Sequence, residues 1–123
     1  MKKIFTHSFA FALCCLSINS MAQISFTASP SSGCAPLTVT FINNTTDPGA
    51  FEYRWSFNDG SPQEIYYSQS PFDHIFYYKG TYNVTLSVYN NFGGFLGQYS
   101  NYVTVNGLSS YDQVNIYPYE ACP

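Results

Sequence analysis

Residues 80–88 read Gly80-Thr81-Tyr82-Asn83-Val84-Thr85-Leu86-Ser87-Val88. From Tyr82 to Val88, aromatic and aliphatic side chains occupy every second position, and Asn, Thr and Ser stand between them. Successive side chains of a β-strand point to opposite faces, so this period of two predicts a strand with one buried and one solvated face.

The same alternation recurs on both sides of this stretch. Further strands are predicted over 24–28, 37–41, 51–57 and 98–105, with weaker ones over 64–67 and 73–77. Gly, Pro, Asn and Asp gather between the runs, as they do in turns, and no window shows a helical stripe. About seven short antiparallel strands in roughly 100 residues predict an all-β fold of two packed sheets.

The single tryptophan, Trp55, marks the predicted centre of the core. It alternates with Phe51, Tyr53 and Phe57, so all four side chains are expected to point inward. We expect Trp55 to lie between the two sheets, because its large apolar area fills the core best there.

The first 22 of the 123 residues have the pattern of a secretory signal peptide. Lys2 and Lys3 precede an apolar run, and Ser20 and Ala22 supply the small residues of a cleavage site after Ala22. The alternative, an uncleaved anchor, is disfavoured because the run is shorter than the about 20 residues of a spanning helix. The sequence therefore predicts a signal peptide (1–22), one domain (23–106) and a flexible tail (107–123).

The charge balance of the mature chain limits its partners. All seven acidic residues lie after the cleavage site, whereas Arg54 and Lys79 are the only bases there, which gives a net charge of −5. With so little positive charge to neutralise phosphates, neither nucleic acid nor an anionic membrane surface is an expected partner. No membrane insertion is expected once the signal peptide is removed.

Four segments together resemble the PKD (polycystic kidney disease) domain family. The stretch Trp55-Ser56-Phe57-Asn58-Asp59-Gly60 is similar to the family's W-D-F-G-D-G signature, and 80–88 to its G-T-Y-x-V-T-L-x-V strand. Residues 74–76 are similar to its H-x-Y element, and 33–41 to its A-P-L-x-V-x-F entry strand. The resemblance covers about 24–105 and implies an immunoglobulin-like β-sandwich. Its signature residues, expected to be structural, are Trp55, Phe57, Asp59, Gly60, His74, Gly80 and Tyr82.

The signature departs from the family pattern at two positions. Ser56 replaces the first acid, and Asn58 replaces the first glycine. Asn tolerates the left-handed conformation, so the turn should persist, while the lost acid argues against a strong calcium site. A weak calcium site at Asn58, Asp59 and Asp73 is left open, but no metal site is assigned and no cofactor is expected.

The tail shows a fainter likeness. Residues 114–118 resemble the opening of a type IX secretion sorting domain, but the chain stops soon afterwards, and no sorting activity is assigned. Together with the signal peptide, the family features indicate a bacterial protein that is secreted or held at the cell surface.

Two cysteines, Cys34 and Cys122, follow the signal peptide. In an oxidising compartment they are a candidate disulfide. The sandwich implied by the resemblance supports this pairing, since its first strand can run parallel to its last and would bring both cysteines to one end.

Catalysis is not expected. His74 is the only histidine of the mature chain, and no motif supplies the nucleophile and orienting group that catalysis would need beside it. We interpret His74 as structural, with ring nitrogens bonded to backbone, and Asp59 as capping its own turn. A small glycoside hydrolase using Asp59, Glu64 and Asp73 is a further alternative.

Exposed tyrosines are the most suggestive functional feature. Tyr66, Tyr67, Tyr77 and Tyr78 are candidate binding residues, because aromatic faces stack on sugar rings or anchor protein partners. The alternative is that these rings cover strand edges. The sequence therefore predicts a non-catalytic extracellular module that contacts proteins or polysaccharides. A structural spacer or self-assembling surface protein is the second hypothesis, and the oligomeric state is left open.

Overall fold

The computed structural model describes residues 21–107 and confirms the predicted all-β sandwich, with eight strands and no helix in that range. The signal peptide and the tail predicted from the sequence lie almost wholly outside the described residues. The strands are β1 (Phe26–Ser29), β2 (Ser32–Cys34), β3 (Leu37–Asn43), β4 (Glu52–Ser56), β5 (Glu64–Tyr66), β6 (Phe72–Phe76), β7 (Gly80–Tyr89) and β8 (Phe95–Asn106). Within 21–107 there is no helix of the length and apolarity that crossing a membrane requires.

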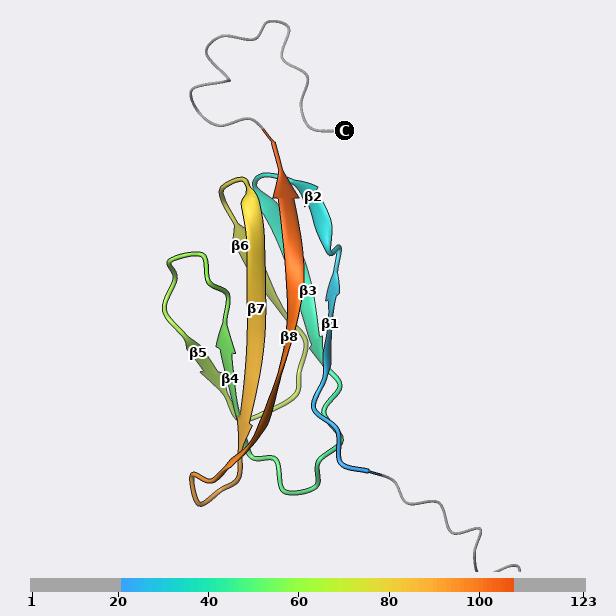
Figure 1. Cartoon of the computed structure of the whole chain (residues 1–123), viewed down its shortest axis with the longest axis vertical. Coiled ribbons are helices and arrows are strands. Elements are labelled where there is room, and N and C mark those ends of the chain that lie inside the picture. The colour runs from blue at the N-terminus through green and yellow to red at the C-terminus, as the bar shows by residue number, and fades with distance from the viewer. Residues whose placement is uncertain (1–20, 108–123) are drawn as a thin grey trace, which may run out of the picture.

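The strands form two sheets that face each other (Figure 1). Sheet A has the order β1-β3-β6, and sheet B has the order β2-β8-β7-β4-β5. All neighbouring pairs are antiparallel except β2 and β8, which run parallel. The chain changes sheets between Ser29 and Ser32, so the break predicted around Pro30 and Gly33 is a crossing that is followed at once by a short strand.

The Trp55 side chain is buried between the two sheets, as the alternation predicts. It exposes 1% of its surface and meets two rings of sheet A edge-on, Phe26 at 5.0 Å and Phe72 at 5.1 Å between ring centroids. The other fully buried large side chains come from both sheets. They are Phe41, Phe57, Phe76, Leu86, Val39, Val84, Val88, Val103 and Val105.

Phe51 departs from the predicted inward set, because it is 49% exposed. Strand β4 begins one residue later, at Glu52. The Phe51 N–H still donates to the Tyr89 carbonyl, but the Phe51 ring packs against Tyr67, with 5.6 Å between centroids. The alternation in the sequence thus begins at Phe51, one residue before strand β4.

A register shift near the β7–β8 turn determines which side chains emerge there. Val88 pairs with Gly97, yet Tyr89 pairs with Phe95 rather than with Leu96. Gly97 has φ +152°, and a Cβ at this position would stand 2.8 Å from Ile24 Cδ1. The irregular backbone therefore sets Phe95 opposite Tyr89 at this end of sheet B.

The alternation of β3 gives a direct test of the core. Phe41 is fully buried, and its neighbour Ile42 is 40% exposed. We expect Phe41→Ala to lower the free energy of unfolding by about 3–5 kcal/mol through loss of buried contacts and a residual cavity. Ile42→Ala should cost less than about 1 kcal/mol. Urea unfolding followed by Trp55 fluorescence measures both, and equal losses would contradict the assigned faces.

The parallel pairing of β2 with β8 bears on the predicted disulfide. Cys34 ends β2 opposite Asn106, the last residue of β8, and the Ala35 N–H donates to the Asn106 carbonyl. The chain therefore leaves β8 beside Cys34 and continues towards Cys122, which lies outside the described residues. The bridge stays a prediction. Mass spectrometry of the mature protein after alkylation without reductant should show no modified cysteine, and two alkylated thiols would refute the pairing.

Candidate functional site

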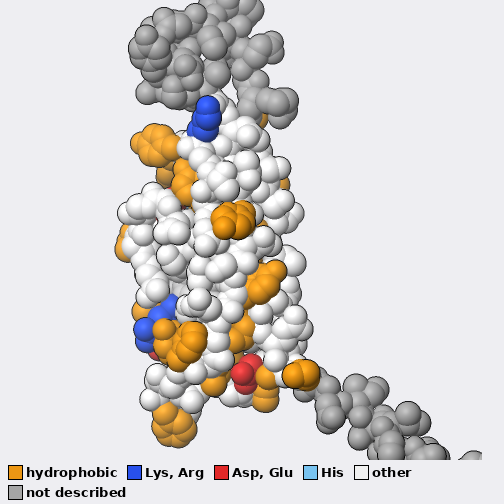
Figure 2. Space-filling model, viewed as in Figure 1, with side chains coloured by type: hydrophobic (Ala, Val, Ile, Leu, Met, Phe, Trp, Pro, Cys, Tyr) orange, Lys and Arg blue, Asp and Glu red, His pale blue; other side chains and the backbone are white. Residues whose placement is uncertain are grey.

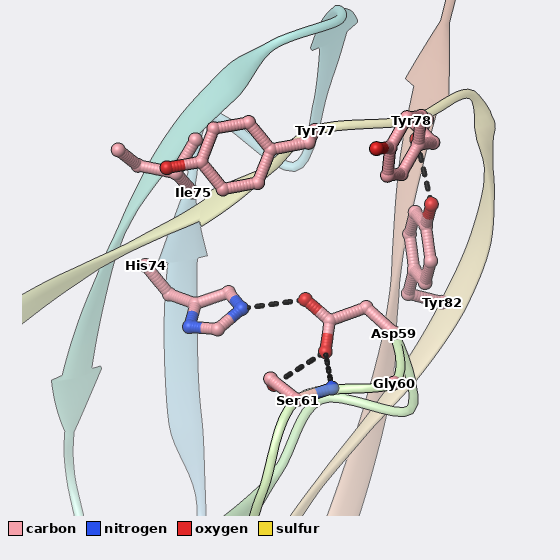
Figure 3. A pocket seen from close by; sticks show the side chains of 8 residues that line it. All are labelled: Asp59, Gly60, Ser61, His74, Ile75, Tyr77, Tyr78 and Tyr82. Carbon is pink, nitrogen blue, oxygen red and sulfur yellow. Dashed lines mark hydrogen bonds and ion pairs between the residues drawn. The ribbon is translucent and has the colours of Figure 1, made fainter.

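A pocket of about 300 Å³ opens between the β4–β5 turn and the connection from β6 to β7 (Figure 3). Its lining residues define what we call the Asp59 pocket. They are Asp59, Gly60, Ser61, His74, Ile75, Tyr77, Tyr78 and Tyr82. The turn that forms one side is tight because Asn58 and Gly60 both adopt positive φ, at 58° and 89°. Asn58 thus takes the left-handed conformation expected of a residue in place of glycine.

Asp59 organises the turn and ties it to sheet A. One carboxylate oxygen, Oδ1, accepts hydrogen bonds from the Ser61 N–H at 3.1 Å and from the Ser61 hydroxyl. The other, Oδ2, lies 2.7 Å from His74 Nε2. Because His74 belongs to β6, this contact joins the β4–β5 turn to the edge of the opposite sheet.

His74 is held on every side by the protein. Its ring stacks on Phe57 at 3.7 Å between centroids and 10° between planes, and its side chain is 11% exposed. Nδ1 lies 3.4 Å from Glu64 Oε1. The sequence predicts backbone partners for this imidazole, but two carboxylates lie beside it instead.

The three acidic residues that the sequence singles out have different partners. Asp59 and Glu64 lie at the two nitrogens of the His74 ring, whereas Asp73 points away and accepts a hydrogen bond from the Thr40 hydroxyl at 2.7 Å. The Ser61 hydroxyl donates to Asp59 rather than to His74.

A metal site is also not apparent in the described part of the chain. Among residues 21–107, no group of three or more His, Cys, Asp or Glu side chains is placed to hold a metal ion. The candidate calcium ligands have separate partners, since the Asn58 amide donates to the Asn83 carbonyl and Asp73 faces Thr40.

The hydrogen bonds set the charge of the Asp59 pocket. Burial alone would raise the pKa of Asp59, but the hydrogen bonds from His74 and Ser61 outweigh it and hold this pKa below the usual 3.8. Burial and the negative charge of Asp59 raise the pKa of Tyr82, whose hydroxyl donates to the Tyr78 carbonyl at 2.6 Å. At neutral pH the Asp59 carboxylate is therefore ionised and the Tyr82 phenol is neutral.

The four tyrosines that the sequence predicts as binding residues do not gather at one place. Tyr77 and Tyr78 line the Asp59 pocket and are 64% and 78% exposed. Tyr67 is 64% exposed but lies beside Phe51.

Tyr66 is half-buried and is not free to bind. Its ring stacks on Phe72 at 4.7 Å between centroids, and its hydroxyl donates to Glu64 at 2.5 Å. Burial, together with the hydrogen bond to Glu64, raises the pKa of Tyr66 to about 12. For this residue the edge-covering alternative describes the structure better.

Tyr67 belongs to a second cluster, which we call the aromatic strip: Phe51, Arg54, Tyr67, Tyr89 and Phe95. The Arg54 guanidinium lies 4.1 Å from the centroid of the Tyr89 ring, and the Tyr89 and Phe95 rings meet edge to face at 5.4 Å. The hydrogen bond with Glu52 raises the pKa of Arg54, and the nearby Tyr89 and Tyr67 hydroxyls add to the effect. Figure 2 shows hydrophobic side chains beside a basic one at the end of this face that carries the β7–β8 turn.

Sequence reasoning finds only part of the aromatic strip. It assigns Phe51 to the core and singles out neither Arg54 nor Phe95. A usable signal is present for Arg54, because a residue between the inward Tyr53 and Trp55 must point outward. No comparable signal exists for Phe95, whose outward position depends on the register shift.

Asp59 gives a prediction with a defined pH dependence. Its folded-state pKa lies below the unfolded value of 3.8, so its contribution to stability is present above pH 3.8 and is lost as the pH falls through the folded value. We expect Asp59→Asn to lower the free energy of unfolding by about 1–3 kcal/mol at pH 7. The difference from wild type should shrink in strong acid. Urea unfolding across pH tests this, with the exposed Asp73→Asn as control, and a difference that is the same at every pH would contradict it.

Comparisons with known proteins place the chain among β-sandwich domains. A family model for the PKD domain matches residues 23–103. No curated relative matches the chain. One similar solved structure, with a TM-score of 0.60 and 25% identity, belongs to work on the promiscuous specificity of carbohydrate-binding modules from the β-sandwich superfamily. That match covers 73% of this chain and 36% of the other, so this chain spans little more than a third of that protein.

Two further similar structures are PKD domains. The PKD1 domain of Vibrio anguillarum Epp has a TM-score of 0.53 and 19% identity, covering 72% of this chain and 98% of that one. The PKD domain of the human VPS10 domain-containing receptor SorCS2 has a TM-score of 0.56 and 19% identity, covering 77% and 85%. At this identity the two structures show the fold. Because the family model spans nearly all of the described sandwich, the chain belongs to the PKD domain family.

Proposed function

We propose that this PKD domain is a non-catalytic extracellular interaction module that binds carbohydrate through the aromatic strip. The observation that carries the proposal is the group of rings near Arg54, in which Phe51 packs against Tyr67 and both Arg54 and Phe95 pack against Tyr89. Phe51 is 49% exposed, Tyr67 64% and Phe95 57%, although large aromatic side chains are usually more buried than this. Exposed aromatic surface of this kind marks interaction sites on soluble domains.

The chemistry of the aromatic strip suits a sugar. Aromatic rings offer broad, rigid contact area with little conformational entropy to lose, which matches the apolar faces of pyranose rings. Arg54 bonds Glu52 through Nε, which leaves its terminal N–H groups available to donate to hydroxyls. The Glu52 carboxylate beside it accepts hydrogen bonds. Stacking area, donors and an acceptor therefore lie together.

Two further observations support this function. The similar β-sandwich structure at 25% identity comes from work on carbohydrate-binding modules. The predicted signal peptide supports an extracellular location, and a bacterial secreted or surface protein is the setting that we propose. The alternative, a structural spacer or self-assembling unit, needs no exposed ring cluster.

The proposal is tested by binding the mature protein, from Gln23 onward, to a panel of insoluble and soluble polysaccharides. We expect Tyr89→Ala and Tyr67→Ala to weaken retention on the recognised polysaccharide about tenfold each, which corresponds to about 1.4 kcal/mol of lost contact. Tyr102→Ala is the matched control, because Tyr102 is 61% exposed on β8 and lies outside the aromatic strip.

Two results would defeat this assignment. One is the absence of binding to every polysaccharide in the panel. The other is binding that Tyr102→Ala weakens as much as Tyr89→Ala does. If mass measured by light scattering also rises with protein concentration, the self-assembling alternative takes its place.

A further inference from the structure

We propose that the Asp59 pocket is a second binding site, separate from the aromatic strip, which takes the ammonium group of a lysine side chain presented by a partner protein. The site does not depend on carbohydrate binding. We infer the site from the side chains that form the floor and walls of the pocket, from the size of the pocket and from the charge of the chain.

The floor of the pocket offers negative charge without a free side-chain donor. The Ser61 hydroxyl is used by Asp59, and the two nitrogens of His74 face Asp59 and Glu64. A carboxylate has about four acceptor positions. Three of those on Asp59 are occupied by its contacts with Ser61 and His74, so acceptor capacity remains. An ammonium group, which has three donors and no acceptor, complements such a floor.

The walls of the pocket are aromatic. Figure 3 shows Tyr77 on one side and Tyr78 with Tyr82 on the other, with the Asp59–His74 pair below them in this view. The hydrogen bond from the Tyr82 hydroxyl to the Tyr78 carbonyl fixes the Tyr82 ring in place. Cations are attracted to tyrosine faces within about 6 Å of the ring centroid, so the walls and the floor favour the same ligand.

The charge of the chain and the size of the Asp59 pocket limit the kind of ligand further. None of the residues that line this pocket is a lysine or arginine, and the mature chain has seven acids against two bases, so cations are attracted and anions repelled. A volume of about 300 Å³ suits one extended side chain rather than a run of sugar rings.

Lysine fits this floor better than arginine does. A guanidinium binds a carboxylate most strongly through two parallel hydrogen bonds, which need both oxygens free on one edge. In Asp59, Oδ1 is occupied by Ser61 and Oδ2 by His74. An ammonium acts as a point charge and requires only one remaining acceptor position.

The inference is tested by NMR titration of the mature protein with Nα-acetyl-lysine methylamide. We expect saturable shifts of the His74 and Tyr82 ring resonances, and binding that weakens as salt is added because the attraction is partly screened. The Nε-acetylated ligand, which has the same shape without the charge, should cause no saturable shift. The corresponding arginine ligand should bind more weakly than the lysine ligand.

The variants avoid residues that hold the turn together. Tyr77→Ala and Tyr78→Ala alter exposed side chains, and each should weaken lysine binding about two- to fivefold. Tyr67→Ala, which alters the aromatic strip, should leave lysine binding unchanged while it weakens polysaccharide retention. Lysine binding and polysaccharide binding can therefore be tested, and contradicted, independently of each other.

Three results would overturn the inference. They are equal binding of the acetylated and unmodified lysine ligands, unchanged affinity in a Tyr77→Ala/Tyr78→Ala double variant, and shifts of the same resonances by neutral sugars.

Discussion

The packing of Trp55 against both edge strands of sheet A is the contact on which the rest of the structure depends. Phe26 and Phe72 meet the indole edge-on from β1 and β6, so one side chain of sheet B touches both margins of the facing sheet. Such edge-to-face pairs add directional preference to simple burial. Once this ring is enclosed, Phe57, two residues later, is carried into the core as well.

The polar part of the signature extends this packing to the surface. Phe57 stacks on His74, and His74 in turn meets Asp59, so one continuous set of contacts runs from the core to the floor of the Asp59 pocket. A buried polar group is costly unless it is paired, and this pairing keeps the β4–β5 turn against β6. The same residues that stabilise the sandwich thus shape the Asp59 pocket.

The sequence predicts the core well because burial imposes a period of two on every long strand. It misses β2, whose three residues join β8 through backbone hydrogen bonds and leave no hydrophobic pattern to detect. Tyr77 and Tyr78 are identified as candidates from exposure alone, but their meeting with Asp59 depends on two distant turns lying together. Phe95 depends on a register shift that no local pattern announces.

Strand β7 sets the distance between the Asp59 pocket and the aromatic strip. It carries Tyr82 at the Asp59 pocket and Tyr89 in the aromatic strip, seven residues further along one uninterrupted strand. At about 3.4 Å per residue the Cα atoms of Tyr82 and Tyr89 lie roughly 24 Å apart, measured along a strand that hydrogen-bonds to neighbours on both sides. Ligands at the two proposed sites would be too far apart to compete and would keep a constant spacing. Occupation of one site would then raise the local concentration of a tethered second ligand at the other.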